Sequence, residues 1–259
     1  MVLCGLLLLA MSTSQGARAG DAAQADTPTA TRTKGQATVG PLYPGGTGTS
    51  HTCTAAVLDS PHGNLLLTAA HCVAGDASGM VFAPGYLRGS TPYGVWTVQR
   101  AWAAPTWLAN QDPTVDLAVL QVADQDNNGT PVTLQSVTGG LPVGQTNRTS
   151  ATRTVTTVGY QNGSNDAPVS CTAVLTSTQG YPTFTCHGYA DGTSGSPFLW
   201  SDQGRAPVLL GVLGGLHQGG CQEWQSFSSP LTVTVYQLLA RAINDLPADA
   251  LPAAGPDGC

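Results

Sequence analysis

The chain has 259 residues, of which only 9% are charged, and its formal net charge is −6. Such a chain offers no basic surface for nucleic acid, so we expect no nucleic-acid partner. Its abundant glycine, threonine and serine favour short strands joined by tight turns.

Residues 1–19 combine a short apolar stretch with the small-residue ending Ala17-Arg18-Ala19. This pattern predicts a signal peptide cleaved after Ala19, and therefore a secreted, extracellular protein. The apolar run is much shorter than the roughly 20 residues that cross a bilayer, so we expect no membrane span. Residues 20–38 are polar and lack periodicity, which predicts a flexible lead or a propeptide.

Segments of strand character follow, each bounded by turn-forming residues. They are TCTAAVLD (52–59), NLLLTAAH (64–71), GVWTVQRAW (94–102), DLAVLQV (116–122), ATRTVTTVGY (151–160), SCTAVLTST (170–178), PTFTCHG (182–188) and PVLLGVLGG (207–215). This rhythm indicates a barrel or a sandwich. The polar stretch 133–149 divides the strands into two groups, so two small barrels fit, one over about 39–135 and one over about 145–230.

Near the C-terminus, apolar residues recur at three- and four-residue spacing, which predicts a helix over about 231–246. Pro247 ends this helix, and residues 247–259 are left as a C-terminal tail.

Three local sequences carry the side chains of nucleophilic catalysis in the order histidine, aspartate, serine. They are LTAAHC with His71, TVDLAVLQV with Asp116 and DGTSGSPFLW with Ser194. A serine hydroxyl becomes a nucleophile when an imidazole takes its proton, and a carboxylate fixes the tautomer that can do so. The glycine-rich turn lets the amides of Gly192 and Ser194 converge on one oxyanion.

Other interpretations compete at each position. Asp112 competes with Asp116, but only Asp116 directly precedes a strand pattern; Ser196 lacks the flanking glycines of Ser194. Taken alone, a histidine beside a cysteine on a buried strand is more often a structural core residue than a catalytic base, and a metal ligand is a third interpretation of His71. The sequence has no CxxC motif, so we expect no metal at His71.

The stretch DQDNNGT (124–130) starts like a calcium loop, but it has Gln135 where the loop needs a glutamate, so we expect a tight turn there. The remaining histidines, His51, His62, His187 and His217, are expected in surface or loop positions, with His217 a candidate for a pocket rim.

These motifs resemble those of the chymotrypsin-like (trypsin-like) serine peptidases, especially the secreted bacterial type. TAAHC, with CTAAVL upstream, is similar to the family's histidine box, DLAVLQV to its aspartate box and GTSGSP to its serine box. The resemblance runs from about Val39 to Ile243. It implies an all-β fold of two packed antiparallel six-stranded β-barrels with a C-terminal α-helix, a peptidase domain over 39–246 and a site in the cleft between the barrels.

The resemblance also implies roles. His71 would be the general base, Asp116 its orienting partner and Ser194 the nucleophile of a secreted serine endopeptidase, with Gly192 and Ser194 forming the oxyanion hole. Such an enzyme needs no cofactor. We expect a monomer that acts on polypeptides, with a proteinaceous inhibitor as a further partner.

All cysteines except Cys4 lie beyond the expected signal peptide, and their even number predicts disulfides. The expected pairs are Cys53–Cys72, Cys171–Cys186 and Cys221–Cys259. The resemblance implies Cys53–Cys72, Cys171 and Cys186 lie on either side of one turn, and Cys221–Cys259 remains by elimination.

The substrate pocket departs from the family pattern. The resemblance places it at Gly188, Tyr189, Asp191, Leu213, Gly214, Gly215 and Leu216. Gly188 replaces the aspartate of trypsin-type pockets, so we do not expect arginine or lysine as P1, the substrate residue before the scissile bond. Leu213 replaces the histidine of glutamate-specific relatives, and a small or apolar P1 is weakly favoured. Asp191 leaves this preference open.

Two further departures concern the active centre. Thr193 replaces the aspartate that receives a new N-terminal ammonium in many relatives, so we expect no such activation switch. Gly214 replaces a serine that often supports the catalytic aspartate.

Two other functions compete with the peptidase interpretation. An α/β-hydrolase esterase fails because its order is serine, aspartate, histidine and because GTSGS is not a GxSxG elbow. A non-catalytic binding protein that retains the peptidase scaffold stays open, because a fold does not dictate a function.

Overall fold

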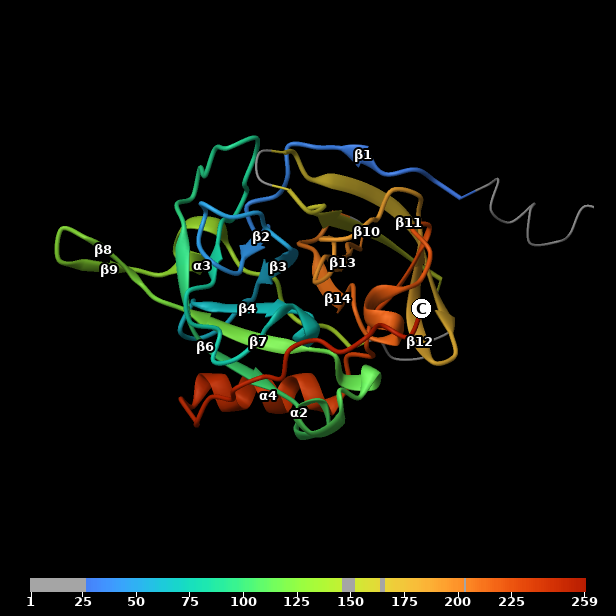
Figure 1. Ribbon diagram of the computed structural model, residues 1–259. Coiled ribbons are helices and arrows are strands. Elements are labelled where there is room, and N and C mark those ends of the chain that lie inside the picture. The colour runs from blue at the N-terminus through green and yellow to red at the C-terminus, as the bar shows by residue number, and fades with distance from the viewer. Residues whose placement is uncertain (1–26, 146–151, 164–165, 203) are drawn as a thin grey trace, which may run out of the picture.

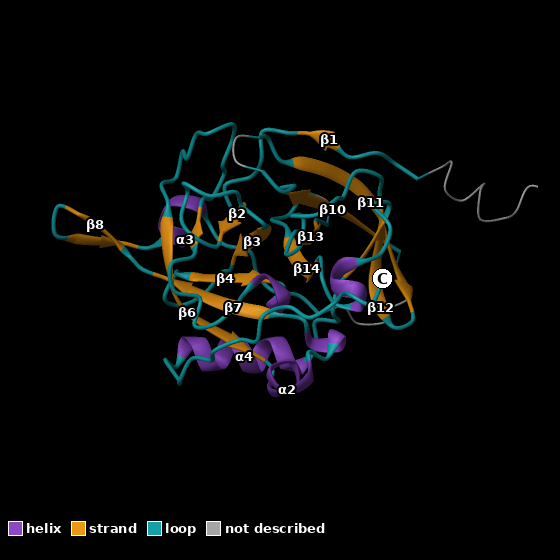
Figure 2. Cartoon of the chain, in the orientation of Figure 1, coloured by secondary structure: helices purple, strands orange, loops and turns teal. Residues whose placement is uncertain are grey.

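The computed structural model describes residues 27–145, 152–163, 166–202 and 204–259. The expected signal peptide and the lead up to residue 26 lie outside the described residues. Strands form most of the molecule, and the helices α2 and α4 lie along one side of it, below the strands in the view of Figure 2. Among the described residues, no helix is long and apolar enough to cross a membrane.

The first half of the chain forms a closed antiparallel barrel in the strand order β2-β3-β4-β7-β6-β5 (Figure 1). Its strands are β2 (Val39–Tyr43), β3 (Cys53–Val57), β4 (Leu65–Thr68), β5 (Val81–Phe82), β6 (Trp96–Ala103) and β7 (Ala118–Val122). Every residue of β3, β4 and β7 is buried, because one face of each strand fills the barrel and the other packs against neighbouring layers. This explains why these strands are apolar almost throughout and do not alternate.

The second half forms an antiparallel sheet in the order β14-β13-β10-β11-β12-β15, with β1 paired to β11. Its strands are β1 (Thr31–Arg32), β10 (Arg153–Gly159), β11 (Val169–Thr178), β12 (Tyr181–Thr185), β13 (Pro197–Trp200), β14 (Val208–Val212) and β15 (Gln225–Phe227). Its two end strands meet at one isolated bridge, between Leu213 and Ser228. The expected fold class, all-β with two packed antiparallel six-stranded barrels and a C-terminal helix, is confirmed. The second unit differs in being a half-barrel with β1 as an added strand, whose ends meet, among the described residues, at that bridge.

The expected C-terminal helix is α4 (Val233–Ile243). The Thr232 side chain caps its N-terminus, and Val235, Leu238 and Ala242 are buried against the first barrel. Among the described residues, five short helices escaped sequence analysis because one or two turns carry too little periodicity. They are η1 (Ala70–Cys72), α2 (Pro105–Asn110), η2 (Pro113–Val115), α3 (Leu134–Thr138) and η3 (Leu216–Gly219).

The stretch 124–130 forms a protruding hairpin between β8 (Gln125–Asn127) and β9 (Thr130–Val132), as Figure 1 shows. Asn128 and Gly129 at its tip both have positive φ, which suits the tight two-residue turn expected there.

The lead differs from the expectation of flexibility over its described part. Thr31 and Arg32 pair with Ser170 and Val169 of β11, and the Ala30 amide donates to the His187 carbonyl. The reason is an open strand edge: β12 pairs only with the far end of β11, so β1 covers the near end. Backbone pairing of this kind leaves no apolar pattern in the sequence.

The six cysteines beyond the lead form three disulfides, in the pairs that we expected: Cys53–Cys72, Cys171–Cys186 and Cys221–Cys259. The first joins β3 to the short helix η1 (Ala70–Cys72), and the second joins β11 to the residue after β12. The third fastens the last residue of the chain to the loop after η3.

Leu238→Ala is expected to lower the free energy of unfolding by about 2–5 kcal/mol, because Leu238 is 2% exposed between α4 and the first barrel. Leu246→Ala is the matched control, since Leu246 is 47% exposed, and should cost under about 1 kcal/mol. Urea denaturation followed by circular dichroism measures both. Equal losses would contradict the packing of α4 described here.

Candidate active site

His71 lies where the first barrel opens towards the second sheet. Strand β4 ends at Thr68, and η1 then turns the chain so that His71 points away from the barrel interior. The Cys53–Cys72 disulfide fixes the residue after His71 to β3. The buried strand NLLLT and the disulfide therefore place this imidazole, whose side chain is only 8% exposed.

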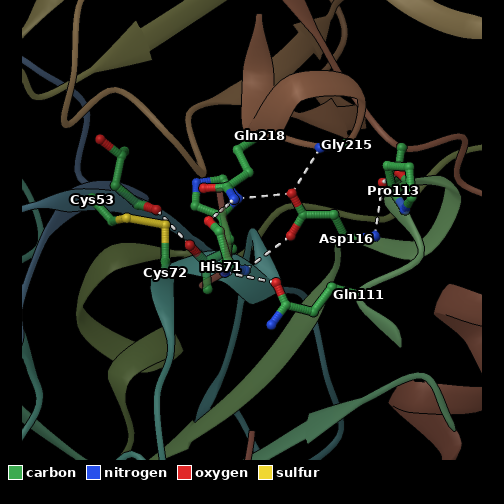
Figure 3. Close-up of polar contacts among 12 residues, drawn as sticks. Cys53, His71, Cys72, Gln111, Pro113, Asp116, Gly215 and Gln218 are labelled. Carbon is green, nitrogen blue, oxygen red and sulfur yellow. Dashed lines mark hydrogen bonds and ion pairs between the residues drawn. A yellow bond between two sulfur atoms is a disulfide. The ribbon is translucent and has the colours of Figure 1, made fainter. Parts of the chain in front are cut away.

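Asp116 is fully buried and its carboxylate receives three N–H donors (Figure 3). Its Oδ2 accepts from His71 Nδ1 at 2.7 Å and from the Gly215 amide at 2.8 Å, and its Oδ1 accepts from the His71 amide at 2.9 Å. A buried carboxylate needs such donors. Because Nδ1 donates to Asp116, the neutral imidazole presents Nε2 as its acceptor.

Two residues that support Asp116 were missed by sequence reasoning. The Asp116 amide donates to Ser229 Oγ at 2.9 Å, and the Ser229 hydroxyl donates to the Pro113 carbonyl at 2.8 Å. Many relatives have a serine at the position of Gly214 that supports the aspartate. In this chain the Gly215 amide provides a hydrogen-bond donor to Asp116 instead. A Cβ on Gly214 would lie 3.0 Å from Asp116 Oδ2, so a larger residue there would crowd the carboxylate. Backbone donors leave no signal in side-chain identity.

Ser194 lies in a turn that is tied to both halves of the molecule. The Thr54 amide of β3 donates to the Ser194 carbonyl at 2.7 Å, and the Gly195 amide donates to the Leu213 carbonyl at 2.7 Å. Gly195 has φ +83°, and a Cβ there would overlap the Thr54 carbonyl oxygen. The turn therefore requires glycine for both its conformation and its close approach to β3.

Gly192 occupies an equally restricted position, with φ +92° and no room for a Cβ beside the Asn162 amide. That amide donates to the Asp191 carbonyl at 2.8 Å, which turns this carbonyl away from the turn. Thr193 is 2% exposed, and its hydroxyl donates to the Ala190 carbonyl at 2.7 Å. At the position where many relatives have an aspartate, the Thr193 side chain therefore forms this local hydrogen bond to Ala190.

One cavity of about 330 Å³ brings His71, Gly192 and Ser194 together. Both disulfide-bonded residues Cys53 and Cys72 also line it. Because these two sulfurs are bonded to each other, they are not available as thiolate ligands beside His71.

A second cavity, of about 560 Å³, adjoins Ser194. Of the seven expected pocket residues, Tyr189, Asp191 and Leu213 line it. Gly215 and Leu216 instead line a separate cavity of about 610 Å³. Gly188 and Gly214 line neither of these cavities.

Glu223 also lines the second cavity and was missed by sequence reasoning. Its carboxylate accepts from the Gly188 amide and pairs with His187 Nδ1 at 2.6 Å. These two contacts, the Gly188 amide first, lower the pKa of Glu223. In the same lining, burial raises the pKa of the Tyr189 phenol, which donates to the Thr157 carbonyl. The cavity therefore has a neutral aromatic wall and a carboxylate that is already paired.

His51 differs from the expectation of a surface or loop histidine, because it is completely buried between the two halves. Its Nε2 lies 2.9 Å from Asp166 Oδ1, and its ring meets the edges of Tyr43, Tyr86 and Tyr160. The His51 amide donates to Gly163, next to the Asn162 that packs against Gly192. The contacts of His51 with Gly163 and Asp166 therefore fix the position of the segment that packs against Gly192.

Gly195→Ala is expected to destabilise the protein by several kcal/mol, because the added methyl group meets the Thr54 carbonyl in addition to the strained φ. Gly180→Ala is the matched control: its φ is +87° and a Cβ there meets nothing within 4 Å, so only the conformational cost of about 1–2 kcal/mol applies. Thermal and urea unfolding measure the difference. A Gly195 variant as stable as the Gly180 variant would contradict the close approach to β3.

Comparisons with known proteins identify a matching family and structures with the same fold. A family model described as Trypsin matches residues 28–237. No curated protein matches the chain in sequence.

Solved structures share the fold. A protease named Anisep from Arthrobacter nicotinovorans is similar with a TM-score of 0.66 and 18% identity, covering 83% of this chain and 100% of that one. A thermostable serine protease, AL20, from an extremophilic microorganism has a TM-score of 0.64 and 20% identity, covering 81% and 98%. Human heparin-binding protein has a TM-score of 0.61 and 15% identity, covering 88% and 100%.

Proposed function

The chain belongs to the trypsin family of serine peptidases, and on that premise we propose that His71, Asp116 and Ser194 are its catalytic triad. The observation that carries the proposal is the buried Asp116 carboxylate, which lies 2.7 Å from His71 Nδ1 while His71 and Ser194 line one cavity. A structural histidine would not need an orienting carboxylate on one nitrogen and a cavity on its other side.

In the proposed reaction, Ser194 Oγ attacks the carbonyl carbon of a peptide bond while His71 Nε2 takes the hydroxyl proton. Asp116 stabilises the imidazolium that forms. The amides of Gly192 and Ser194 hold the negative charge on the former carbonyl oxygen. His71 then gives the proton to the leaving amine, and the C–N bond breaks. Water, activated by His71, hydrolyses the acyl-enzyme and frees Ser194.

We assign the P1 side chain to the cavity of about 560 Å³ and propose that it is small or apolar rather than arginine or lysine. Leu213 and the neutral Tyr189 contribute apolar surface to its walls, and Gly188 contributes no acidic side chain. Asp191 also lines this cavity, so the peptide library described below decides between an apolar and a basic P1 side chain. The Glu223 carboxylate is engaged by the Gly188 amide and His187, so it is not free to pair with a substrate cation.

We further propose that the protein acts outside the cell as a monomer, with a proteinaceous inhibitor as a partner. Its three disulfides suit an oxidising compartment, in agreement with the signal pattern of residues 1–19. The triad itself uses no metal or cofactor chemistry.

A non-catalytic binding role remains the second candidate, since one structure with this fold is named a heparin-binding protein. The described hydrogen bonds around Asp116 disfavour it, because they hold one tautomer of His71, which a scaffold does not require. Labelling of Ser194 separates the two candidates: a serine-directed phosphonate should form an adduct on Ser194 that mass spectrometry locates, and Ser194→Ala should abolish it.

Asp116→Asn is expected to lower kcat about 10⁴-fold on a peptide substrate, because an amide in place of the carboxylate favours the wrong tautomer of His71. Asp112→Asn is the matched control, since Asp112 only caps η2 through Thr114 and should leave kcat within about two-fold. Steady-state kinetics on a peptide library give both values and the P1 preference. Equal activity of the two variants would sink the assignment of Asp116.

A further inference from the structure

The C-terminal tail crosses the front of the molecule, from the end of α4 to the second sheet (Figure 1). Leu251 is buried and pairs with Gly75 of the first barrel through two backbone hydrogen bonds. Residues 252–259, here called the C-terminal strap, then continue to Cys259, which is bonded to Cys221 on the other half. The strap therefore bridges the two halves and is fastened at both ends.

Side chains from both halves hold the backbone of the strap between these ends. Gln111, which follows α2, donates to the Ala253 carbonyl at 2.8 Å and accepts from the Gly255 amide at 2.8 Å. Gln218 of η3 donates to the Gly255 carbonyl at 2.7 Å. Both glutamines are labelled in Figure 3, and Gln218 lines the same cavity as His71. These three hydrogen bonds, the contact of His217 Nδ1 with the Asp257 carbonyl at 3.1 Å and the Cys221–Cys259 disulfide hold the strap in one path.

The strap also lines the groove around Ser194. The cavity with His71 and Ser194, the P1 cavity and the cavity of about 610 Å³ adjoin one another at Gln218, which is a wall residue of all three; together they are here called the groove. Asp257 of the strap lines both the cavity with Ser194 and the cavity of about 610 Å³. The strap is thus a wall of the groove, next to the reacting residues.

The cavity of about 610 Å³ is the part of the groove that the strap encloses. Its other walls come from α2 and from Gly215 to Gln218. Apolar residues predominate in its lining: Trp107, Leu108, Pro113, Leu216, Pro252 and Pro256. A concave, mainly apolar cavity of this size suits a bulky apolar group, and a polypeptide lying in the groove would place a side chain there.

We propose that the C-terminal strap is a specificity-determining wall of the substrate groove, which selects polypeptides with a large apolar side chain on one flank of the scissile bond. This inference rests on the proposed peptidase function. The strap forms the outer side of the apolar cavity, so a substrate side chain there is shielded from water only while the strap is in place. Its selectivity depends on the Cys221–Cys259 fastening and on Gln111.

The test compares the parent protein with two variants: Cys221→Ser/Cys259→Ser, which releases the strap, and Cys221→Ser with residues 252–259 deleted. Paired peptides carry leucine or serine at each position on either side of the scissile bond. In the parent, leucine should raise kcat/KM at least about ten-fold at one position on one flank, as burial of an apolar side chain predicts. In both variants this ratio should fall to within about three-fold.

Cys171→Ser/Cys186→Ser is the matched control, because it removes a disulfide of the second sheet that does not touch the strap, and the leucine ratio should persist in it. A short ester that does not reach the cavity reports the state of the catalytic centre in every variant, and circular dichroism reports folding. If a variant does not fold, Gln111→Ala, which loosens the strap without breaking a disulfide, gives the comparison.

The outcomes separate the strap from the triad. Persistence of the leucine ratio after strap release overturns the proposal, as does an equal rise in turnover of the ester and all peptides, which would make the strap a plug. If the parent neither turns over the ester nor reacts with the phosphonate, the peptidase function fails. The strap is then tested by binding: fluorescence anisotropy measures the affinity of the labelled peptide pairs for the parent and for both strap variants, each carrying Ser194→Ala. Loss of the leucine preference in both strap variants supports the proposal, and persistence of that preference contradicts it.

Discussion

The active centre depends on one buried carboxylate, that of Asp116. Its three donors come from both halves of the molecule, since the His71 side chain and amide belong to the first barrel and the Gly215 amide to the second sheet. A charge in this position is stable only while all these donors stay aimed at it, because unpaired buried charge is expensive. The need to satisfy Asp116 therefore fixes the relative position of the two halves at the cleft, and with it the orientation of His71.

The same interface positions the Ser194 turn from the other side. Thr54 of the first barrel and Leu213 of the second sheet each form a backbone hydrogen bond to this turn. Glycine at 195 lets the turn approach β3 that closely. Behind it, the buried His51 imidazole, its partner Asp166 and three tyrosines lie in the same interface. Burial raises the pKa of Tyr43 and Tyr160 there, which keeps both phenols neutral. The Ser194 turn is thus held by polar contacts across the interface, and these contacts are directional where apolar packing is not.

Segments outside the two β units complete the structure around the cleft. The lead adds β1 to the open edge of β11, and the C-terminal tail joins Gly75 to Cys221 across the front of the cleft. Both segments are polar or rich in proline, and neither has a core of its own. Backbone hydrogen bonds, two glutamine side chains and a disulfide replace apolar burial in holding them. Such segments can change in sequence without disturbing the barrels, which makes them suitable places to adjust how substrates are selected.

The sequence by itself determined the strand-rich class, the C-terminal helix and the candidate residues His71, Asp116 and Ser194, because apolar runs, helical periodicity and side-chain chemistry are local properties of the chain. Sequence analysis did not predict the short helices, β1 or the burial of His51. A single helical turn, one pair of backbone contacts or one buried ring leaves no periodic pattern in the sequence. Only the tertiary structure decided that Gly215 and Ser229 support Asp116, that Glu223 reaches Gly188, and that Gln111 and Gln218 hold the strap. These contacts join residues far apart in sequence, and several use backbone amides that every residue except proline possesses, so side-chain identity does not reveal them.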